Sequence, residues 1–166
     1  MKLVLIGFMG TGKSSVALLL AKKLGLEAVE MDDLIIKQAG GKSIRDIFAA
    51  DGEAAFRELE AAVGNELRDC EQVVISTGGG VVINEDLMDS LSDGALVINL
   101  DASFETALQR AGQDGKRPLL ASIDQARTLY ESRKPFYSKH ATLCITTDGK
   151  SVGEVAEEIV KQVHNL

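Results

Sequence analysis

The stretch Gly7-Phe8-Met9-Gly10-Thr11-Gly12-Lys13-Ser14, at residues 7–14, decides the fold. It matches the pattern G-x-x-x-x-G-K-[ST] at every fixed position. An apolar run typical of a buried strand precedes it, and apolar residues at three- and four-residue spacing, typical of a helix, follow it. A glycine-rich turn in that context points backbone N–H groups inward, and the helix adds the positive end of its dipole. The sequence therefore predicts a phosphate-binding loop.

Each part of this loop has an expected contact with a nucleoside triphosphate, which we expect to be ATP. The N–H groups of Gly10, Thr11 and Gly12 surround the phosphates. Lys13 contacts the β- and γ-phosphates and is expected to be catalytic, while the Ser14 hydroxyl ligates Mg²⁺. Ser15 is expected among the nucleotide contacts.

Short β-rich runs alternate with longer helical stretches along the whole chain, a pattern typical of a parallel sheet covered on both faces. We expect a single α/β domain over residues 1–166, doubly wound, with five parallel strands in the order 2-3-1-4-5. The predicted strands are Lys2–Ile6, Glu27–Met31, Gln72–Ser76, Ala95–Leu100 and Thr142–Thr146. The apolar stripe of the first helix is expected at Val16, Leu19, Leu20 and Leu24, with Lys23 as a polar exception.

Two segments depart from this alternation. Residues 33–69 are too long for one crossover helix, so a helical insertion is expected at about 32–60. Residues 111–122, AGQDGKRPLLAS, hold two glycines, a proline and a basic pair, and predict a mobile loop. Loops of this length without secondary structure are often active-site lids.

The amino-acid composition of the chain limits the kinds of molecule that it can bind. The net charge is −7 and the pI is about 4.9, which argues against nucleic-acid and membrane-surface binding because both need a positive field. Cys70 and Cys144 form no C-x-x-C pair and are expected to be reduced thiols. The N-terminal apolar run is too short for a signal or membrane span. We expect a cytoplasmic protein, a monomer, acting on a small molecule.

Within the phosphate-loop proteins, the sequence favours a small-molecule kinase. GTPases carry an Asn/Thr-Lys-x-Asp motif that reads guanine, and the sequence has none. Motor and transporter ATPases are normally larger than 166 residues. A small chain with an acceptor-sized insertion and a lid fits a kinase better.

Further motifs identify a family. In chain order they are GFMGTGKSS at 7–15, VEMDDLI at 29–35, GKSIRDIF at 41–48, GEAAFRELE at 52–60, STGGGVV at 76–82, KRPLL at 116–120 and SRKPFYSKHA at 132–141. In this order, and over nearly the whole length, the chain resembles the shikimate kinases. The resemblance implies transfer of the γ-phosphoryl group of MgATP to the 3-hydroxyl of shikimate, on the route to chorismate and the aromatic amino acids.

The resemblance also implies which residues bind the two substrates. Arg57 and Arg133 match the positions that bind the acceptor's carboxylate, a task suited to the planar fork of arginine. Gly78, Gly79 and Gly80 contact the acceptor and lie near the γ-phosphate. Arg117, in the lid, is placed over the phosphates and stabilises the transition state. Arg110 matches a position that packs near the nucleotide.

One motif departs from the family pattern. The family's second strand ends in Asp-x-Asp, where the first Asp helps to hold Mg²⁺ through water and the second takes the acceptor hydroxyl. Here the chain reads Val29-Glu30-Met31-Asp32-Asp33. Counting forward from Lys13 assigns Glu30 to the metal and Asp32 to the hydroxyl, whereas counting back from Gly41 favours Met31 and Asp33. We prefer the forward count, because strand and phosphate loop are rigidly connected, and expect Asp32 to be catalytic.

Two alternatives remain open at this point. Another small-molecule kinase, such as a gluconate kinase, can also use Asp32 and an arginine. A nucleotide-binding module that has lost catalysis is the rival from a different class, and Glu30 keeps it open. The pair Arg57 and Arg133 together with KRPLL fits the shikimate pattern better.

Overall fold

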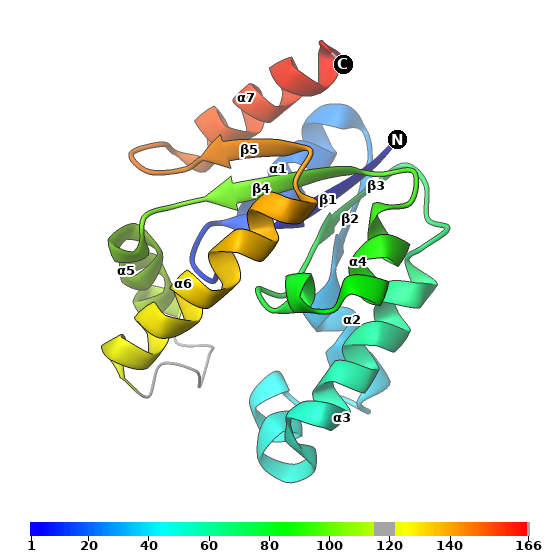
Figure 1. Ribbon diagram of the computed structural model, residues 1–166. Helices are drawn as coiled ribbons and strands as arrows, with labels where there is room; N and C mark the ends of the chain where they lie inside the picture. The colour runs from blue at the N-terminus through cyan, green and yellow to red at the C-terminus, as the bar shows by residue number, and fades with distance from the viewer. Residues whose placement is uncertain (115–121, 166) are drawn as a thin grey trace.

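The computed structural model describes residues 1–114 and 122–165, and in these ranges the predicted sheet is confirmed. All strand pairs are parallel, and the order is β2-β3-β1-β4-β5 (Figure 1). The strands are β1 (Lys2–Ile6), β2 (Glu27–Glu30), β3 (Val73–Ser76), β4 (Leu96–Asp101) and β5 (Leu143–Thr146). Five of the predicted boundaries were wrong by a residue. The clearest case is β2, which ends at Glu30 because the next helix begins directly at Met31.

The helices cover both faces of the sheet and extend beyond one end of it (Figure 1). They are α1 (Lys13–Leu24), α2 (Met31–Gln38), α3 (Ile44–Glu66), α4 (Glu85–Ser92), α5 (Phe104–Asp114), α6 (Ile123–His140) and α7 (Val152–His164), with a 3-10 turn at Val81–Ile83. None of the helices in the described ranges is both long and apolar enough to cross a membrane.

The helical insertion consists of α2 and α3. It begins at Met31 and runs to Glu66, further than the predicted end near residue 60. Helix α3 is kinked at Gly52, whose φ of 84° lies in the left-handed region that glycine adopts without strain. The kink separates the first turns of α3, where Ile47 is buried, from the later turns, which pack on the core through Phe56 and Val63.

Two hydrophobic clusters fill the two faces of the sheet, as the continuous apolar strands require. On β1, Leu3 and Leu5 face the cluster under α1 and α7, while Val4 and Ile6 face the cluster under α3, α4 and α6. The predicted stripe of α1 was only partly correct. Its buried side chains are Lys13, Val16, Ala17, Leu20 and Ala21, while Leu19 and Leu24 are half-buried and Lys23 is exposed. Small alanines form the contact because α1 packs closely against the sheet and α7.

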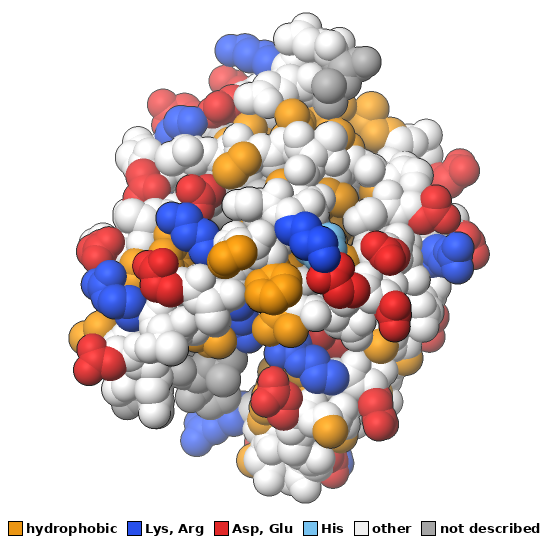
Figure 2. Space-filling view, in the orientation of Figure 1, with side chains coloured by type: hydrophobic (Ala, Val, Ile, Leu, Met, Phe, Trp, Pro, Cys, Tyr) orange, Lys and Arg blue, Asp and Glu red, His pale blue; other side chains and the backbone are white. Residues whose placement is uncertain are grey.

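The carboxyl ends of the strands lie at one edge, where open α/β sheets bind ligands. At this edge the phosphate loop follows β1, Asp32 follows β2 and the glycine run follows β3. A space-filling view in the same orientation shows basic side chains just above the α3 end of the molecule (Figure 2). Of the predicted lid, residues 111–114 belong to α5 and Ser122 caps α6. Residues 115–121, with Arg117, lie outside the described residues.

Candidate active site

The phosphate loop joins β1 to α1 through glycines in the left-handed region. Gly10 has φ 76° and Gly12, the N-cap of α1, has φ 92°. At Gly10 a β-carbon would clash with the carbonyl oxygen of Ala107, so the loop rests directly on the backbone of α5. Lys13 is 6% exposed, and its ammonium donates to the carbonyl oxygens of Gly7 at 2.8 Å and Phe8 at 2.9 Å. The loop and its lysine therefore form a compact cradle with a positive charge inside it.

The hydroxyl groups of the loop divide into inner and outer ones. Thr11 is buried, and its hydroxyl donates to the carbonyl oxygen of Phe8 at 2.9 Å, which fixes the turn. Ser14 and Ser15 are exposed on the first turn of α1. The Thr11 N–H also donates to the carbonyl oxygen of Phe8, at 3.4 Å, so the exposed hydroxyls of the loop are those of Ser14 and Ser15.

A carboxyl group with one buried oxygen, that of Glu30, lies next to the start of α1. Glu30 at the end of β2 is in register with Ser76 at the end of β3, and the Glu30 carboxyl lies close to the hydroxyls of both Ser76 and Ser14. Burial raises the pKa of Glu30, and the hydroxyls of Ser14 and Ser76 act in the opposite direction. Its Oε2 atom is buried and has no hydrogen-bond partner among the described residues. A buried carboxylate oxygen without a partner, next to a loop hydroxyl, suits a hydrated divalent cation.

A second cluster, of two arginines, surrounds the glycine run. A β-carbon at Gly80 would lie 2.6 Å from Arg57 Nη2 and 3.0 Å from Arg133 Nη2. At Gly79 it would lie 3.7 Å from Arg133 Nη1 and 3.5 Å from the backbone N of Met9 in the phosphate loop. The two guanidinium groups, one from α3 and one from α6, therefore meet over the same backbone, next to the loop.

Acidic side chains approach the same glycine run from the insertion. A β-carbon at Gly78 would lie 3.5 Å from Asp32 Oδ1 and 3.1 Å from Glu60 Oε1. Glu60 is 1% exposed, and its Oε2 accepts from Arg57 Nη1 at 2.6 Å. Burial raises the pKa of Glu60, while Arg57 acts in the opposite direction. Asp33, the next residue of α2, is by contrast exposed.

Helix α6 places Arg133 in the site from the opposite side. Its buried residues Ala126, Tyr130, Arg133 and Tyr137 recur at helical spacing and face the core. Arg133 is 5% exposed, and burial lowers the pKa of its guanidinium, which nevertheless stays charged because arginine does so in proteins. Tyr137 donates to the carbonyl oxygen of Gly79 at 2.6 Å, which ties the glycine run to α6.

Arg110 lies on the other side of the phosphate loop, on α5. Its Nη1 donates to Thr147 Oγ1 and its Nη2 to the carbonyl oxygen of Thr147, both at 2.9 Å. It is therefore separated from the arginines of the glycine run.

A family model for shikimate kinases matches residues 9–164 of this chain. The chain belongs to the shikimate kinase family. It is 40% identical to a shikimate kinase of Thermodesulfovibrio yellowstonii, over 99% of this chain and 95% of that protein. A solved structure of Acinetobacter baumannii shikimate kinase in complex with shikimate superposes with a TM-score of 0.93 at 32% identity, covering 99% of this chain and 93% of that one.

The fold extends beyond the shikimate kinases. A gluconokinase from Sinorhizobium meliloti is similar with a TM-score of 0.60, but at 17% identity. That likeness shows a common fold alone, so it does not favour gluconate as the acceptor.

Sequence reasoning missed several residues of this shikimate kinase site. Glu60 lies three residues after Arg57, and that spacing on a helix was the available signal for an ion pair. Ser76 and Tyr137 carried no such signal, because their places depend on strand register and on how α6 packs. The described residues contain no group of three His, Cys, Asp or Glu side chains placed to hold a metal ion.

Proposed function

We propose that this protein transfers the γ-phosphoryl group of ATP to the 3-hydroxyl of shikimate, as its family does, on the route to chorismate and the aromatic amino acids. The observation that carries this proposal is the convergence of Arg57 and Arg133 over Gly80, beside the phosphate loop. Two converging guanidinium groups bind one carboxylate through charge-assisted hydrogen bonds. Shikimate offers that carboxylate, on a ring small enough to place a hydroxyl near the γ-phosphate.

The acceptor lies between the insertion and the glycine run. Its carboxylate binds Arg57 and Arg133, and the N–H groups of Gly78, Gly79 and Gly80 contact its polar edge. Asp32 at the start of α2 orients the 3-hydroxyl and accepts its proton as the new O–P bond forms. In support, Asp32 Oδ1 lies close to Gly78, whereas Asp33 is exposed. The insertion, which supplies both Asp32 and Arg57, is thus the acceptor-binding part.

The nucleotide lies on the other side of the reacting phosphorus. The N–H groups of Gly10, Thr11 and Gly12 bind the phosphates, Lys13 contacts the β- and γ-phosphates, and Ser15 and Arg110 add contacts to the nucleotide. Phosphoryl transfer of this kind depends on positioning and charge. We assign Arg117, which lies outside the described residues, the stabilisation of charge on the transferring group, within a lid between α5 and α6 that excludes water.

The residues around Glu30 fit a magnesium ion. Bound with ATP, Mg²⁺ neutralises charge on the β- and γ-phosphates. The Ser14 hydroxyl would hold it directly and the Glu30 carboxylate through water, a role suited to the buried Oε2 that has no partner among the described residues. Glu30 carries one carbon more than the family's aspartate, so its carboxylate reaches further from the strand.

We also propose that the protein works as a cytoplasmic monomer on small molecules, without nucleic-acid or membrane partners. Its net charge of −7 supports the absence of nucleic-acid and membrane partners, since polyanionic surfaces would repel the protein. Any anionic substrate is then captured by local arginines and not by the overall field.

A coupled assay of ADP release tests the proposed reaction. Purified protein with MgATP receives shikimate, gluconate or no acceptor. Turnover that depends on shikimate is the expected result. Turnover on gluconate alone, or ATP binding without turnover on either acceptor, would overturn the proposal in favour of a sugar-acid kinase or a nucleotide-binding module.

A further inference from the structure

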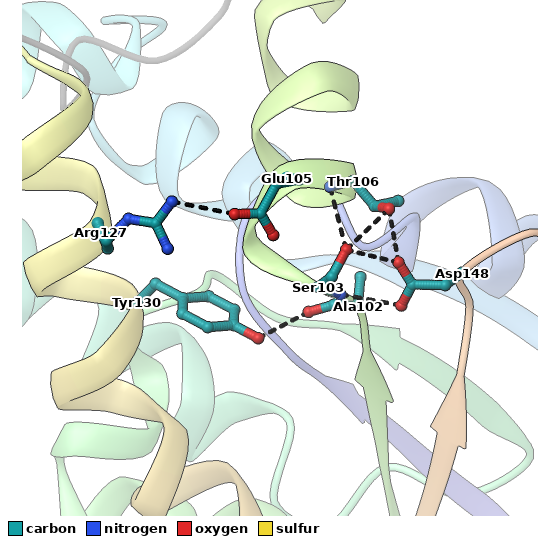
Figure 3. Close-up of polar contacts among 7 residues, drawn as sticks. All are labelled: Ala102, Ser103, Glu105, Thr106, Arg127, Tyr130 and Asp148. Carbon is teal, nitrogen blue, oxygen red and sulfur yellow. Dashed lines mark hydrogen bonds and ion pairs between the residues drawn. The ribbon is translucent and has the colours of Figure 1, made fainter.

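One carboxylate, that of Asp148, ties the loop after β5 to the start of α5 (Figure 3). Its Oδ1 accepts from the hydroxyls of Ser103 at 2.7 Å and Thr106 at 2.5 Å, and its Oδ2 accepts from the backbone N of Ser103 at 2.9 Å. Ser103 in turn caps α5, accepting from the backbone N of Thr106 at 3.2 Å. Asp148 therefore completes a helix cap from a segment more than forty residues away in the chain.

The same loop has a second link to α5, through Thr147 and Arg110. Arg110 donates twice to Thr147, which is 1% exposed, and the backbone N of Thr147 donates to Asp101 at the end of β4 at 2.7 Å. Ser103, Thr106 and Arg110 recur at three- and four-residue spacing, so they lie on one face of α5. The loop after β5 is thus bound to α5 at several positions along one face of the helix.

Helix α5 is held on its other flank as well. Tyr130 of α6 donates to the carbonyl oxygen of Ala102 at 2.8 Å (Figure 3). Arg127 of α6 donates to Glu105 at 3.0 Å, and its guanidinium lies 4.3 Å from the ring centre of Phe104. These contacts fix the start of α5 to α6. They do not involve the loop after β5, which is held to α5 by the hydrogen bonds of Asp148 and Arg110.

The position of this loop relates it to the nucleoside. The phosphate loop follows the central strand β1, and the acceptor groups lie after β2 and β3 on one side of it. With the acceptor on that side, the rest of the nucleotide must extend the other way, over the ends of β4 and β5. Arg110 and the loop after β5 lie there. The start of α5 also supports the phosphate loop at Gly10, through Ala107.

We propose that Asp148 is a positioning residue for the nucleoside part of ATP, because it holds the loop after β5 against α5 and so fixes Thr147 and Arg110. The proposal rests on the use of ATP proposed above. Hydrogen bonds from Thr106 and Ser103 lower the pKa of Asp148 to about 2, so it is ionised at physiological pH and accepts all three bonds. In the sequence TTDGK, Asp148 looks like an ordinary solvent-exposed aspartate of a turn. The sequence alone therefore does not predict its contacts with α5.

The test compares ATP with inorganic tripolyphosphate, which has the phosphates without the nucleoside. In Asp148→Ala the Kd for ATP, measured by titration calorimetry with Mg²⁺, should rise about tenfold, while the Kd for tripolyphosphate and the KM for shikimate stay within about twofold. Asp148→Asn keeps one acceptor oxygen and should recover part of the ATP affinity. Thr106→Val, which removes one donor with little change of shape, should show a smaller loss in the same direction.

Glu154→Ala is the matched control for stability. Glu154 caps the adjacent helix α7 with Ser151 and does not contact α5, so its loss should lower Tm without changing the Kd for ATP. An unchanged Kd for ATP in Asp148→Ala and Thr106→Val, or an equal rise for ATP and tripolyphosphate, would overturn the proposal. Failure of the proposed reaction is a separate result, since it shows as a wild-type protein that binds ATP but does not turn over shikimate.

Discussion

Arg57 Nη1 donates to Glu60 Oε2 at 2.6 Å, and Glu60 is 1% exposed. Arg57 is about one-quarter exposed, so the buried carboxylate of Glu60 pairs with a half-buried guanidinium that faces the site. Glu53 pairs with the same arginine at 3.5 Å but is 70% exposed. Buried, short pairs fix geometry, whereas exposed pairs are worth little. Glu60 is therefore the residue that orients the guanidinium group of Arg57.

The first prediction concerns this orientation. Glu60→Gln should raise the KM for shikimate about tenfold, because the charge that fixes the Arg57 guanidinium is lost. The Kd for ATP should not change. Glu53→Gln, which removes the exposed partner of the same arginine, is the control and should alter the KM less than threefold or so. Equal effects of the two substitutions would show that burial of the Glu60 pair has no special role.

The second prediction concerns pH and stability. Burial raises the pKa of Glu60 above its unfolded value, so the native state holds its proton more tightly than the unfolded state does. Its contribution to stability is complete below the unfolded pKa and is lost as pH rises through the native one. Compared with Glu60→Gln, the wild type should therefore become relatively less stable as the pH rises above the ordinary pKa of a glutamate, measured by urea unfolding. A wild-type advantage that grows with pH would contradict this.

The third prediction concerns Gly80, whose φ of −97° and ψ of −5° any residue can adopt. Gly80→Ala should therefore leave the fold intact, but its β-carbon would lie 2.6 Å from Arg57 Nη2 and displace the guanidinium. The KM for shikimate should rise about tenfold or more with the Tm little changed. Gly153→Ala in α7, where a β-carbon finds its nearest neighbour at 3.8 Å, is the control and should leave both values near wild type. Normal shikimate binding by Gly80→Ala would place the carboxylate elsewhere.

The fourth prediction decides between two neighbouring aspartates. Asp32→Ala should lower kcat at least a hundredfold, as expected when a general base is lost, and leave the Kd for ATP unchanged. Asp33→Ala should keep most of the activity, because Asp33 is exposed on α2. If only the Asp33 variant loses turnover, the backward count from Gly41 is the correct register.

Local patterns in the sequence predicted most of the fold and the parts of the site that lie next to it. The phosphate loop and the five strands follow from short-range signals, and the forward count from Lys13 favours Asp32, whose Oδ1 lies near Gly78. The rest depends on contacts between distant segments. Glu30 meets Ser76 through strand register, and Asp148 caps a helix that begins over forty residues earlier. No local pattern carries such information, since the partners are brought together only by tertiary packing.

The central claim is that Arg57 and Arg133 bind the carboxylate of the acceptor, and exchange of that carboxylate tests it most directly. kcat/KM is measured for shikimate and for its methyl ester, with the wild type and with Arg133→Gln. The wild type should prefer shikimate by about a hundredfold in kcat/KM. The variant should lose most of that preference, because removing the Arg133 charge lowers kcat/KM for the charged substrate and leaves that for the ester unchanged. A variant that keeps the full preference would contradict the account.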